Sequence, residues 1–458
     1  MSPKKNNLKL SKETKDIDFF MRRIYERCKS KLNLHNIASH NIGNMYGQYL
    51  RNQDIAKSSS KKLPYTIWVI LSSIFNENMS IIIGSIIYTL FGIPRLIFYS
   101  LSEKKNLFTF NGEIKDGIIF INTGKSNEDL IKKWIYKKFD EKILELERSY
   151  DEKINLLNIY KIPKFFKIYI LNAIETIKDI IYLKKELSLN NQKLKYLMPQ
   201  WFVNIQRESL WVIRHYSWSK LYLKEYKIKK AYITFNGSVE LGFMKGLKNA
   251  NFNYIEHGYP IRNIVPLNCN QIVYSKMHKD YINFFDPSIK VDIIKNQYFP
   301  KGKINPKRSI VIASMEDKDF FKIEEVSENI KNLLIFAKQN SWSIILRKRN
   351  YGSDDFEKKI DFKFDDISYS SLESFDECLK KYEPTMLWTT WSTALLHAKS
   401  YKVIPIAFVK NSINDYCVCD LESISYVVFN NQRLHKLKNA LKINDPDYFQ
   451  IIKTSLQI

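Results

Sequence analysis

A carboxylate and an imidazole follow an apolar stretch in the segment YIEHGYP, residues 254–260. Glu256 and His257 come at the end of that stretch, and Gly258 follows directly. Both side chains are candidate general bases, because histidine titrates near neutral pH and a desolvated glutamate has a similar range. Gly258 would let the backbone approach a ligand closely. The alternative is that both side chains satisfy loop hydrogen bonds, but a position at the end of a strand favours the catalytic interpretation.

Four hydroxyl side chains follow a second apolar stretch, in LWTTWSTAL at 387–395. They are Thr389, Thr390, Ser392 and Thr393, and a helical pattern begins at their end. Hydroxyls and backbone amides at the start of a helix are suited to a phosphate group. Simple capping by Ser392 or Thr390 needs no ligand, although one cap does not use four hydroxyls.

Three cations, Arg347, Lys348 and Arg349, follow the apolar stretch SIIL. At the carboxyl end of a strand they could neutralise the phosphates of a bound donor. The alternative is an ordinary solvated run of charge.

The sequence offers no set of metal ligands. Only 5 cysteines occur, and their spacing fits neither a disulfide framework nor a zinc site. We therefore expect no metal and no cofactor, and a reducing compartment. The cysteines are Cys28, Cys269, Cys378, Cys417 and Cys419.

The elements that must position these residues begin near residue 229, where strand patterns start to alternate with helical ones. This alternation predicts parallel sheets wound by helical crossovers. A connector rich in Pro, Gly and Lys near residue 300 divides the pattern, so we expect an α/β fold with two Rossmann-like domains facing each other across a cleft. Strands are expected at 229–235, 252–258, 271–276, 290–296, 308–314, 341–348, 385–390 and 403–408, and helices at 238–250, 279–285, 324–340, 373–382 and 392–401.

The first part of the chain has a different character. Residues 1–62 are polar and basic, and residues 63–101 form two apolar runs separated by Asn76, Glu77 and Asn78. The second run just reaches the length of about 20 residues that a membrane span needs. A pair of buried core helices and a re-entrant or interfacial membrane hairpin are both compatible with it. Residues 107–122 indicate two short strands, and the pattern from there to about residue 226 is mostly helical.

Lys and Arg total 72 against 48 Asp and Glu, which gives a formal net charge of +24. Such an excess points to an anionic partner: a membrane surface, a phosphorylated substrate or nucleic acid. We expect no nucleic acid, because no RNA-recognition, zinc-finger or helix-turn-helix pattern is present.

Three stretches together resemble a known family. They cover residues 231–258 and 271–285, and then residues 387–408. They resemble the two domains of GT-B glycosyltransferases that build bacterial surface carbohydrates such as capsule and lipopolysaccharide. The resemblance implies metal-independent transfer of a sugar from a nucleotide donor, with Glu256 or His257 deprotonating the acceptor. It further implies donor-binding residues Gly258, Lys348, Arg349, Thr389, Thr390, Ser392 and Thr393, and acceptor-side candidates Asn236, Glu240 and Arg262.

Within that family, transferases using CMP-linked acidic sugars of the sialic-acid or Kdo type are similar. They commonly carry a His-Pro dipeptide after the strand that here ends in residues 347–350, and this chain lacks that dipeptide, which counts against a CMP donor. The His-Gly turn followed by a hydroxyl pair also resembles teichoic-acid polymerases that move polyol phosphates from CDP carriers. The alternatives to a glycosyltransferase are therefore a CDP-polyol phosphotransferase and a basic nucleic-acid-binding protein.

The expected organisation has four parts. Residues 1–62 are a basic polar segment, and 63–105 a membrane-associated or buried helical hairpin. Residues 106–300 form a Rossmann-like acceptor domain with a long helical insertion, and 301–458 a Rossmann-like donor domain. The expected partners are a nucleotide-sugar donor, a glycan or glycolipid acceptor and the inner-membrane surface, which implies a cytoplasmic location at the periphery of that membrane.

Overall fold

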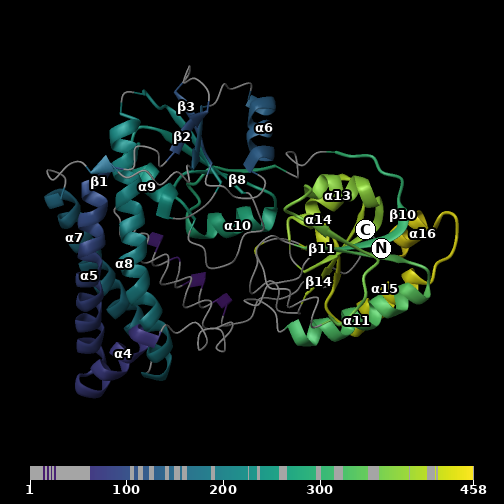
Figure 1. Cartoon of the computed structure of the whole chain (residues 1–458), viewed down its shortest axis with the longest axis horizontal. Helices are drawn as coiled ribbons and strands as arrows, with labels where there is room; N and C mark the ends of the chain where they lie inside the picture. The colour runs from purple at the N-terminus through teal and green to yellow at the C-terminus, as the bar shows by residue number, and fades with distance from the viewer. Residues whose placement is uncertain are drawn as a thin grey trace.

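The structure is a computed structural model of the chain, and it contains two large β-sheets and a group of long helices (Figure 1). It describes residues 14–15, 18–19, 22, 25–26, 62–103, 108–111, 117–122, 128–139, 144–148, 155–156, 162–186, 191–224, 226–234, 238–256, 266–294, 301–313, 323–348, 360–390, 392–409, 418 and 421–456.

The C-terminal sheet has six strands, all parallel, in the order β12-β11-β10-β13-β14-β15. Numbered along the chain this is 3-2-1-4-5-6, the Rossmann order, in which the winding direction reverses between the first and fourth strands. The strands are β10 (Lys307–Ala313), β11 (Ser343–Lys348), β12 (Asp366–Tyr369), β13 (Pro384–Thr389), β14 (Ile404–Phe408) and β15 (Tyr426–Val428).

Helices cover both faces of this sheet. Ile310 and Ile312 of β10 belong to a core with α11, α15 and α16, whereas Val311, between them, belongs to a core with α13 and α14. Successive side chains of a strand point to opposite faces, so a strand covered on both sides is apolar throughout. The helices are α11 (Ile323–Gln339), α13 (Phe375–Tyr382), α14 (Ala394–Ser400), α15 (Asn431–Leu441) and α16 (Tyr448–Leu456).

The N-terminal sheet has seven strands in the order β2-β4-β3-β6-β7-β8-β9, and only its edge strand β2 is antiparallel. Its winding direction reverses between β3 and β6. The strands are β2 (Phe108–Asn111), β3 (Ile118–Asn122), β4 (Leu144–Arg148), β6 (Lys230–Ile233), β7 (Asn251–Ile255), β8 (Asn270–Val273) and β9 (Val291–Ile293), and the helices beside them are α6 (Glu128–Phe139), α9 (Ser238–Gly246) and α10 (Lys276–Phe285). A separate antiparallel pair joins β1 (Ser102–Glu103) to β5 (Asn155–Leu156).

The expected α/β fold with two Rossmann-like sheets is thus confirmed. The stretch up to residue 226 is mostly helical as expected, through α6 and the helices Ile162–Glu186 and Asn191–Tyr222, but strand β4 lies inside it, which the sequence interpretation did not include. Its sequence LELER alternates with the period of a strand, and Leu146 is fully buried. Short strands of this kind depend on neighbours for their hydrogen bonds, and β4 obtains them from β3 and β2.

Four long helices lie beside the N-terminal sheet: α4 (Lys62–Ile74), α5 (Glu77–Leu101), α7 (Ile162–Glu186) and α8 (Asn191–Tyr222). Figure 1 shows them as a bundle at the side of the molecule away from the six-stranded sheet. The α8 helix joins the bundle to the sheet, because one side of it packs on α9 and the other on α5. Both contacts use glycines: a Cβ on Gly242 would lie 2.9 Å from the Val212 carbonyl oxygen, and one on Gly84 would lie 2.3 Å from the Phe202 ring.

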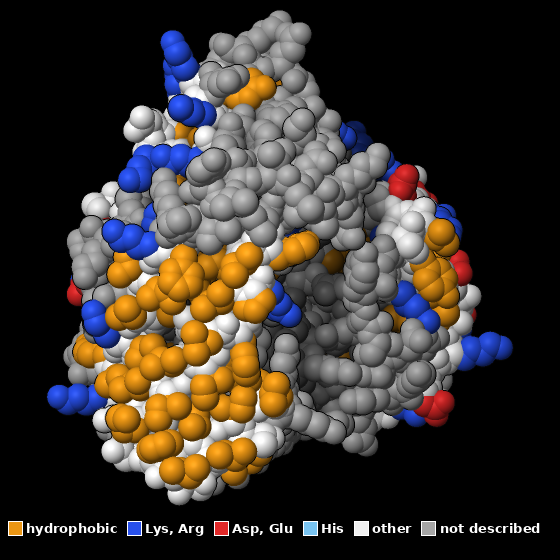
Figure 2. Space-filling model, turned by 60° about the vertical axis from the view of Figure 1, so that its left-hand side comes forward, with side chains coloured by type: hydrophobic (Ala, Val, Ile, Leu, Met, Phe, Trp, Pro, Cys, Tyr) orange, Lys and Arg blue, Asp and Glu red, His pale blue; other side chains and the backbone are white. Residues whose placement is uncertain are grey.

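The α5 helix meets the length and composition requirement for a membrane span over Glu77–Phe98. Its inner side is buried against α7 and α8, whereas its outer side is exposed. Figure 2 shows a broad hydrophobic surface over this part of the molecule. The hairpin therefore has a buried face, as the interpretation as core helices predicts, and an exposed apolar face.

Described residues near the N-terminus attach to α10. The Tyr25 hydroxyl donates to Asp286 Oδ2 at 2.9 Å, and the Phe19 ring lies 5.2 Å from that of Phe284. Tyr25 of the basic N-terminal segment therefore belongs to a core of the N-terminal domain, whereas Phe19 is 57% exposed.

The two sheets belong to one packed molecule. A single apolar cluster contains Phe120, Ile255 and Tyr274 from the first domain together with Leu395 and Leu396 of α14. The loops that would line the expected cleft fall largely outside the described residues.

Candidate functional site

The carboxyl edge of the six-stranded sheet, between β10 and β13, is the topological switch point at which open α/β sheets bind ligands. Thr389 is the last residue of β13, and Thr390 follows it. The hydroxyl cluster noticed in the sequence therefore stands at the position that the topology selects. Local sequence identified the residues, and the strand order shows where they lie.

The hydroxyls of this cluster are used unequally. Ser392 Oγ accepts a hydrogen bond from the Ala394 backbone N–H at 3.3 Å, so it caps the start of α14. Thr393 occupies the N-cap position without a side-chain cap bond. Thr389 is 1% exposed, and its Oγ1 has no hydrogen-bond partner among the described residues. Capping therefore accounts for Ser392 but not for Thr389. A buried hydroxyl without a partner costs free energy that a bound ligand would recover.

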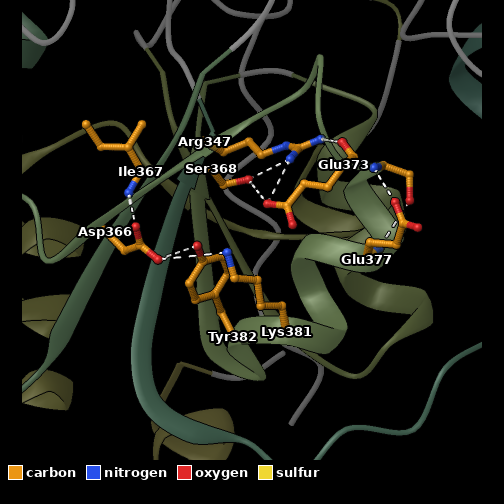
Figure 3. Close-up of polar contacts among 9 residues, drawn as sticks. Arg347, Asp366, Ile367, Ser368, Glu373, Glu377, Lys381 and Tyr382 are labelled. Carbon is orange, nitrogen blue, oxygen red and sulfur yellow. Dashed lines mark hydrogen bonds and ion pairs between the residues drawn. The ribbon is translucent and has the colours of Figure 1, made fainter.

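The three cations after β11 also differ from one another. Arg347 is 5% exposed and tied into a network (Figure 3): its guanidinium donates to Ser368 Oγ at 2.6 Å and to the Glu373 backbone oxygen at 2.6 Å. Arg347 thus joins β12 and the following turn to β11, which corrects the idea that all three cations face a donor. Lys348 is half-buried, with its Nζ 5.8 Å from the centre of the Tyr369 ring. Arg349 lies outside the described residues.

The strand registers place the cations at the end of β11 and the hydroxyls at the end of β13 at the same edge of the sheet. Ala313 of β10 pairs with Arg347, and Ile312 pairs with Trp388. Lys348 and Thr389 therefore both lie at the carboxyl edge, on the two strands that flank β10. Neighbouring strands are about 4.8 Å apart, so these two backbone positions are separated by about 10 Å. The two positions therefore lie at one edge of the sheet, on either side of the strand at the switch point.

Glu256, directly after β7, is buried rather than directed to solvent. It is 1% exposed, and its Oε2 accepts from the Tyr274 backbone N–H at 2.6 Å and lies 3.2 Å from His278 Nδ1. Burial raises the pKa of Glu256, and the nearby His278 lowers it by a smaller amount. In this arrangement Glu256 fixes the carboxyl ends of β7 and β8 to the start of α10.

Other ionisable groups are enclosed near Glu256. Burial raises the pKa of Tyr254, and the negative charges of Glu256, Cys269 and Glu240 raise it further. Glu240, an acceptor-side candidate in the first turn of α9, is also 1% exposed. Glu240 and Glu256 therefore belong to the interior of the sheet domain. Of the other sequence candidates, His257, Gly258, Arg262 and Asn236 lie outside the described residues.

Two histidine pairs emerge only in the structure. One is His278 with Glu256. The other is His397 of α14, whose Nδ1 lies 3.2 Å from Asp376 Oδ1 and whose ring packs at 5.5 Å on Phe375. The sequence indicates only the position of His278, because Ser275, three residues before it, is a favoured N-cap residue and places that histidine in the first turn of α10.

No group of three or more His, Cys, Asp or Glu side chains suited to a metal ion occurs among the described residues. A cavity of about 340 Å³ opens at the other end of β14, beside the residues that precede β15. Its walls include Lys399, Lys402 and Lys453. It lies at the amino ends of the strands, so it is separate from the switch-point site.

The two carboxyl edges approach each other in the described residues. Ser275, just past β8, donates through Oγ to the Val418 backbone oxygen at 3.3 Å, and Val418 belongs to the segment after β14. The hydroxyl cluster of one sheet and the Glu256 end of the other are thus on the sides where the two domains meet.

Comparison with known proteins gives little beyond this geometry. No protein-family model and no curated protein sequence matches the chain. Among solved structures, a crystal structure of TarM aligns with 53% of this chain and 54% of its own, at 16% identity and a TM-score of 0.35. The chain thus spans about half the length of that protein.

Proposed function

We propose that this protein is a glycosyltransferase that moves a sugar from a nucleotide-activated donor to a lipid-linked or surface glycan of a bacterial capsule or lipopolysaccharide type. The observation that carries the proposal is the buried Thr389 hydroxyl, which has no hydrogen-bond partner among the described residues, at the switch point of a 3-2-1-4-5-6 parallel sheet. The sequence resemblance to GT-B glycosyltransferases supports the same assignment, and the exposed apolar face of α4 and α5 suits an enzyme whose acceptor is held in a membrane.

In the proposed reaction the donor phosphates lie against Thr389, Thr390, Ser392 and Thr393, with Lys348 and Arg349 neutralising their charge. The leaving nucleotide keeps its phosphate oxygens in these contacts as the sugar–oxygen bond breaks. His257 takes the proton from the attacking acceptor hydroxyl. Glu256 holds the strand end that presents His257, because its own carboxyl is enclosed by Tyr274 and His278. Gly258 lets the turn approach the donor, and Asn236 and Arg262 contact the acceptor.

A thermal-shift panel with CMP, CDP, UDP, GDP and ADP tests donor binding. A ligand that binds only the folded protein raises its melting temperature. At a ligand concentration of a hundred times Kd, the free energy of unfolding increases by about 2.7 kcal/mol. We expect one nucleotide to stabilise the protein and Thr389→Val to weaken that stabilisation, since valine keeps the shape and removes the hydroxyl. Thr385→Val, on the same strand but at its amino end, is the matched control. No stabilisation by any nucleotide would contradict the proposal.

Transfer itself is measured with the sugar forms of the stabilising nucleotide and a membrane glycolipid extract. We expect His257→Ala to reduce transfer at least a hundredfold while nucleotide binding is retained. Transfer of a polyol phosphate in place of a sugar would instead identify the CDP-polyol phosphotransferase of the teichoic-acid type. Wild-type turnover in His257→Ala would remove that residue from the mechanism.

A further inference from the structure

The exposed surface of α4 and α5 is mostly apolar along its length and carries few charges, which is unusual for a protein surface. Its large apolar side chains are between 39% and 66% exposed. Figure 2 shows them as a continuous area with no Asp or Glu within it and Lys and Arg along its border. We call this surface the apolar face; it consists of Leu63, Val69, Ile70, Ile74, Phe75, Met79, Ile86, Leu90, Phe91, Ile97 and Phe98.

Several hydroxyls on these two helices bond to backbone oxygens of their own helix. Ser73 Oγ donates to the Ile70 backbone oxygen at 2.7 Å, and Thr89 Oγ1 donates to that of Ser85 at 2.7 Å. Hydroxyls bonded within their own helix are compatible with an apolar environment. From Leu63 to Phe98 the only charged residues are Glu77 and Arg95, and Glu77 Oε2 lies 2.6 Å from Lys184 Nζ.

The packing of α5 decides between crossing a membrane and lying on one. An α-helix of 25 residues is about 37 Å long, enough to cross a hydrocarbon core of about 30 Å. However, α7 runs beside α5 in the opposite direction: Tyr169 donates to the Thr89 backbone oxygen at the middle of α5, and Lys184 reaches Glu77 at its first residue. A membrane-crossing α5 would carry α7 with it.

That consequence is unfavourable because α7 carries exposed cations, Lys167, Lys178 and Lys185. Each would enter the hydrocarbon at a cost of about 2.5–3.5 kcal/mol or more. With α5 parallel to the membrane surface, the same lysines can reach the headgroup region, where anionic lipids attract them. A second copy of the chain fits less well, since a two-fold contact would bring like-charged borders together.

We infer that α4 and α5 lie in the plane of an anionic membrane, with the apolar face inserted into one leaflet and no segment of the hairpin crossing it. The inference does not depend on the chemistry of the proposed function, because it needs neither donor nor acceptor. It specifies a one-sided attachment by a hairpin that also belongs to the folded core through Trp68 and Phe202.

Co-sedimentation of the full chain with vesicles of phosphatidylcholine and phosphatidylglycerol tests the surface. We expect the triple variant Ile86→Gln, Leu90→Gln, Phe91→Gln to lower the vesicle-bound fraction at least tenfold. Because all three side chains are about half exposed, the variant should fold, and its melting temperature and circular dichroism verify this. The matched control is Leu372→Gln with Ile451→Gln, which removes exposed apolar groups from the other domain and should leave binding unchanged.

Labelling tests the orientation. We expect Asn78→Cys, at the tip of the hairpin, to react with a membrane-impermeant maleimide from outside the vesicles as fast as Leu372→Cys, after subtraction of the native cysteines. Protection of Asn78→Cys until detergent is added would show a spanning helix and overturn the inference. Absence of vesicle binding, with a dimer in sedimentation that the triple variant dissociates, would assign the apolar face to a second copy and overturn it as well.

Discussion

At the carboxyl end of β11, the Arg347 guanidinium shows how a cation at a predicted site can serve the structure. It contacts Ser368 and Glu373, while the Glu373 side chain is only 18% exposed. A buried ion pair contributes little net stability, but removal of one partner leaves the other without compensation. The cations that we propose for donor binding are therefore Lys348 and Arg349, which follow Arg347 in the sequence.

We expect Arg347→Met to lower the free energy of unfolding by about 3 kcal/mol, because Glu373 and Ser368 lose their buried partner. Urea unfolding followed by fluorescence measures this change. The control is Lys338→Met, whose ion pair with Asp365 is more than one-third exposed and should contribute less than about 1 kcal/mol. Equal stability of Arg347→Met and the native chain would mean that the network is replaceable.

Glu256 gives a pH dependence whose sign follows from its raised pKa. Below the unfolded pKa the carboxyl is protonated in both states and its burial costs least. As the pH rises above about 4.5, the unfolded chain releases this proton before the folded chain does. The free energy of unfolding therefore falls until the pH reaches the raised pKa of Glu256 in the folded state. We therefore expect Glu256→Gln, which cannot ionise, to gain stability relative to the native chain between pH 4.5 and 7.5. Denaturant melts at both pH values test this; the opposite trend would show that the charged pair with His278 dominates.

At the scale of elements, the contact between α5 and α8 holds the hairpin to the sheet domain. Gly84 faces Phe202, which is fully buried and stacked on Tyr88 at 5.2 Å between ring centres. The glycine is thus required by a close approach of two helices.

We expect Gly84→Ala to destabilise the protein by about 1–2 kcal/mol. Alanine favours a helix by up to about 1 kcal/mol, but overpacking against the immobilised Phe202 ring costs about 1–3 kcal/mol. The double variant Gly84→Ala, Phe202→Leu should recover part of the loss, since leucine leaves room for the added methyl group. Urea unfolding of both variants measures these changes in the free energy of unfolding. A Gly84→Ala protein more stable than the native chain would show that the two helices can move apart at no cost.

At the scale of the whole molecule, the two sheets share one apolar cluster through α14. Leu396 is 1% exposed within it, whereas Leu437 is buried in a cluster confined to the six-stranded domain. The position of the carboxyl edges relative to each other therefore depends on side chains such as Leu396.

We expect Leu396→Ala to cost about 2–5 kcal/mol and to accelerate amide hydrogen exchange in strands of both sheets. Leu437→Ala, a matched cavity on the far side of the second sheet, should accelerate exchange there and leave β3 and β6 less affected. Amide hydrogen exchange, measured on peptides by mass spectrometry, tests both variants. Identical exchange patterns in the two variants would mean that the domains already unfold as one unit.

The net charge of +24 belongs to this scale too. Its proposed partners, donor phosphates at the switch point and anionic lipid beside the apolar face, lie in different parts of the molecule.

The sequence by itself determined the α/β class, most strand positions after residue 229, the hydroxyls at the end of β13 and the apolar nature of α4 and α5. These properties follow from periodicity and residue type, which act over a few neighbouring residues. It did not determine that Glu256 points inward to His278, that Arg347 is tied to a residue 26 positions away, or which side of α5 is buried. Those outcomes depend on partners from other elements, because a polar side chain's role is set by what surrounds it once the strands are paired and the helices packed. Only the tertiary structure brings those partners together.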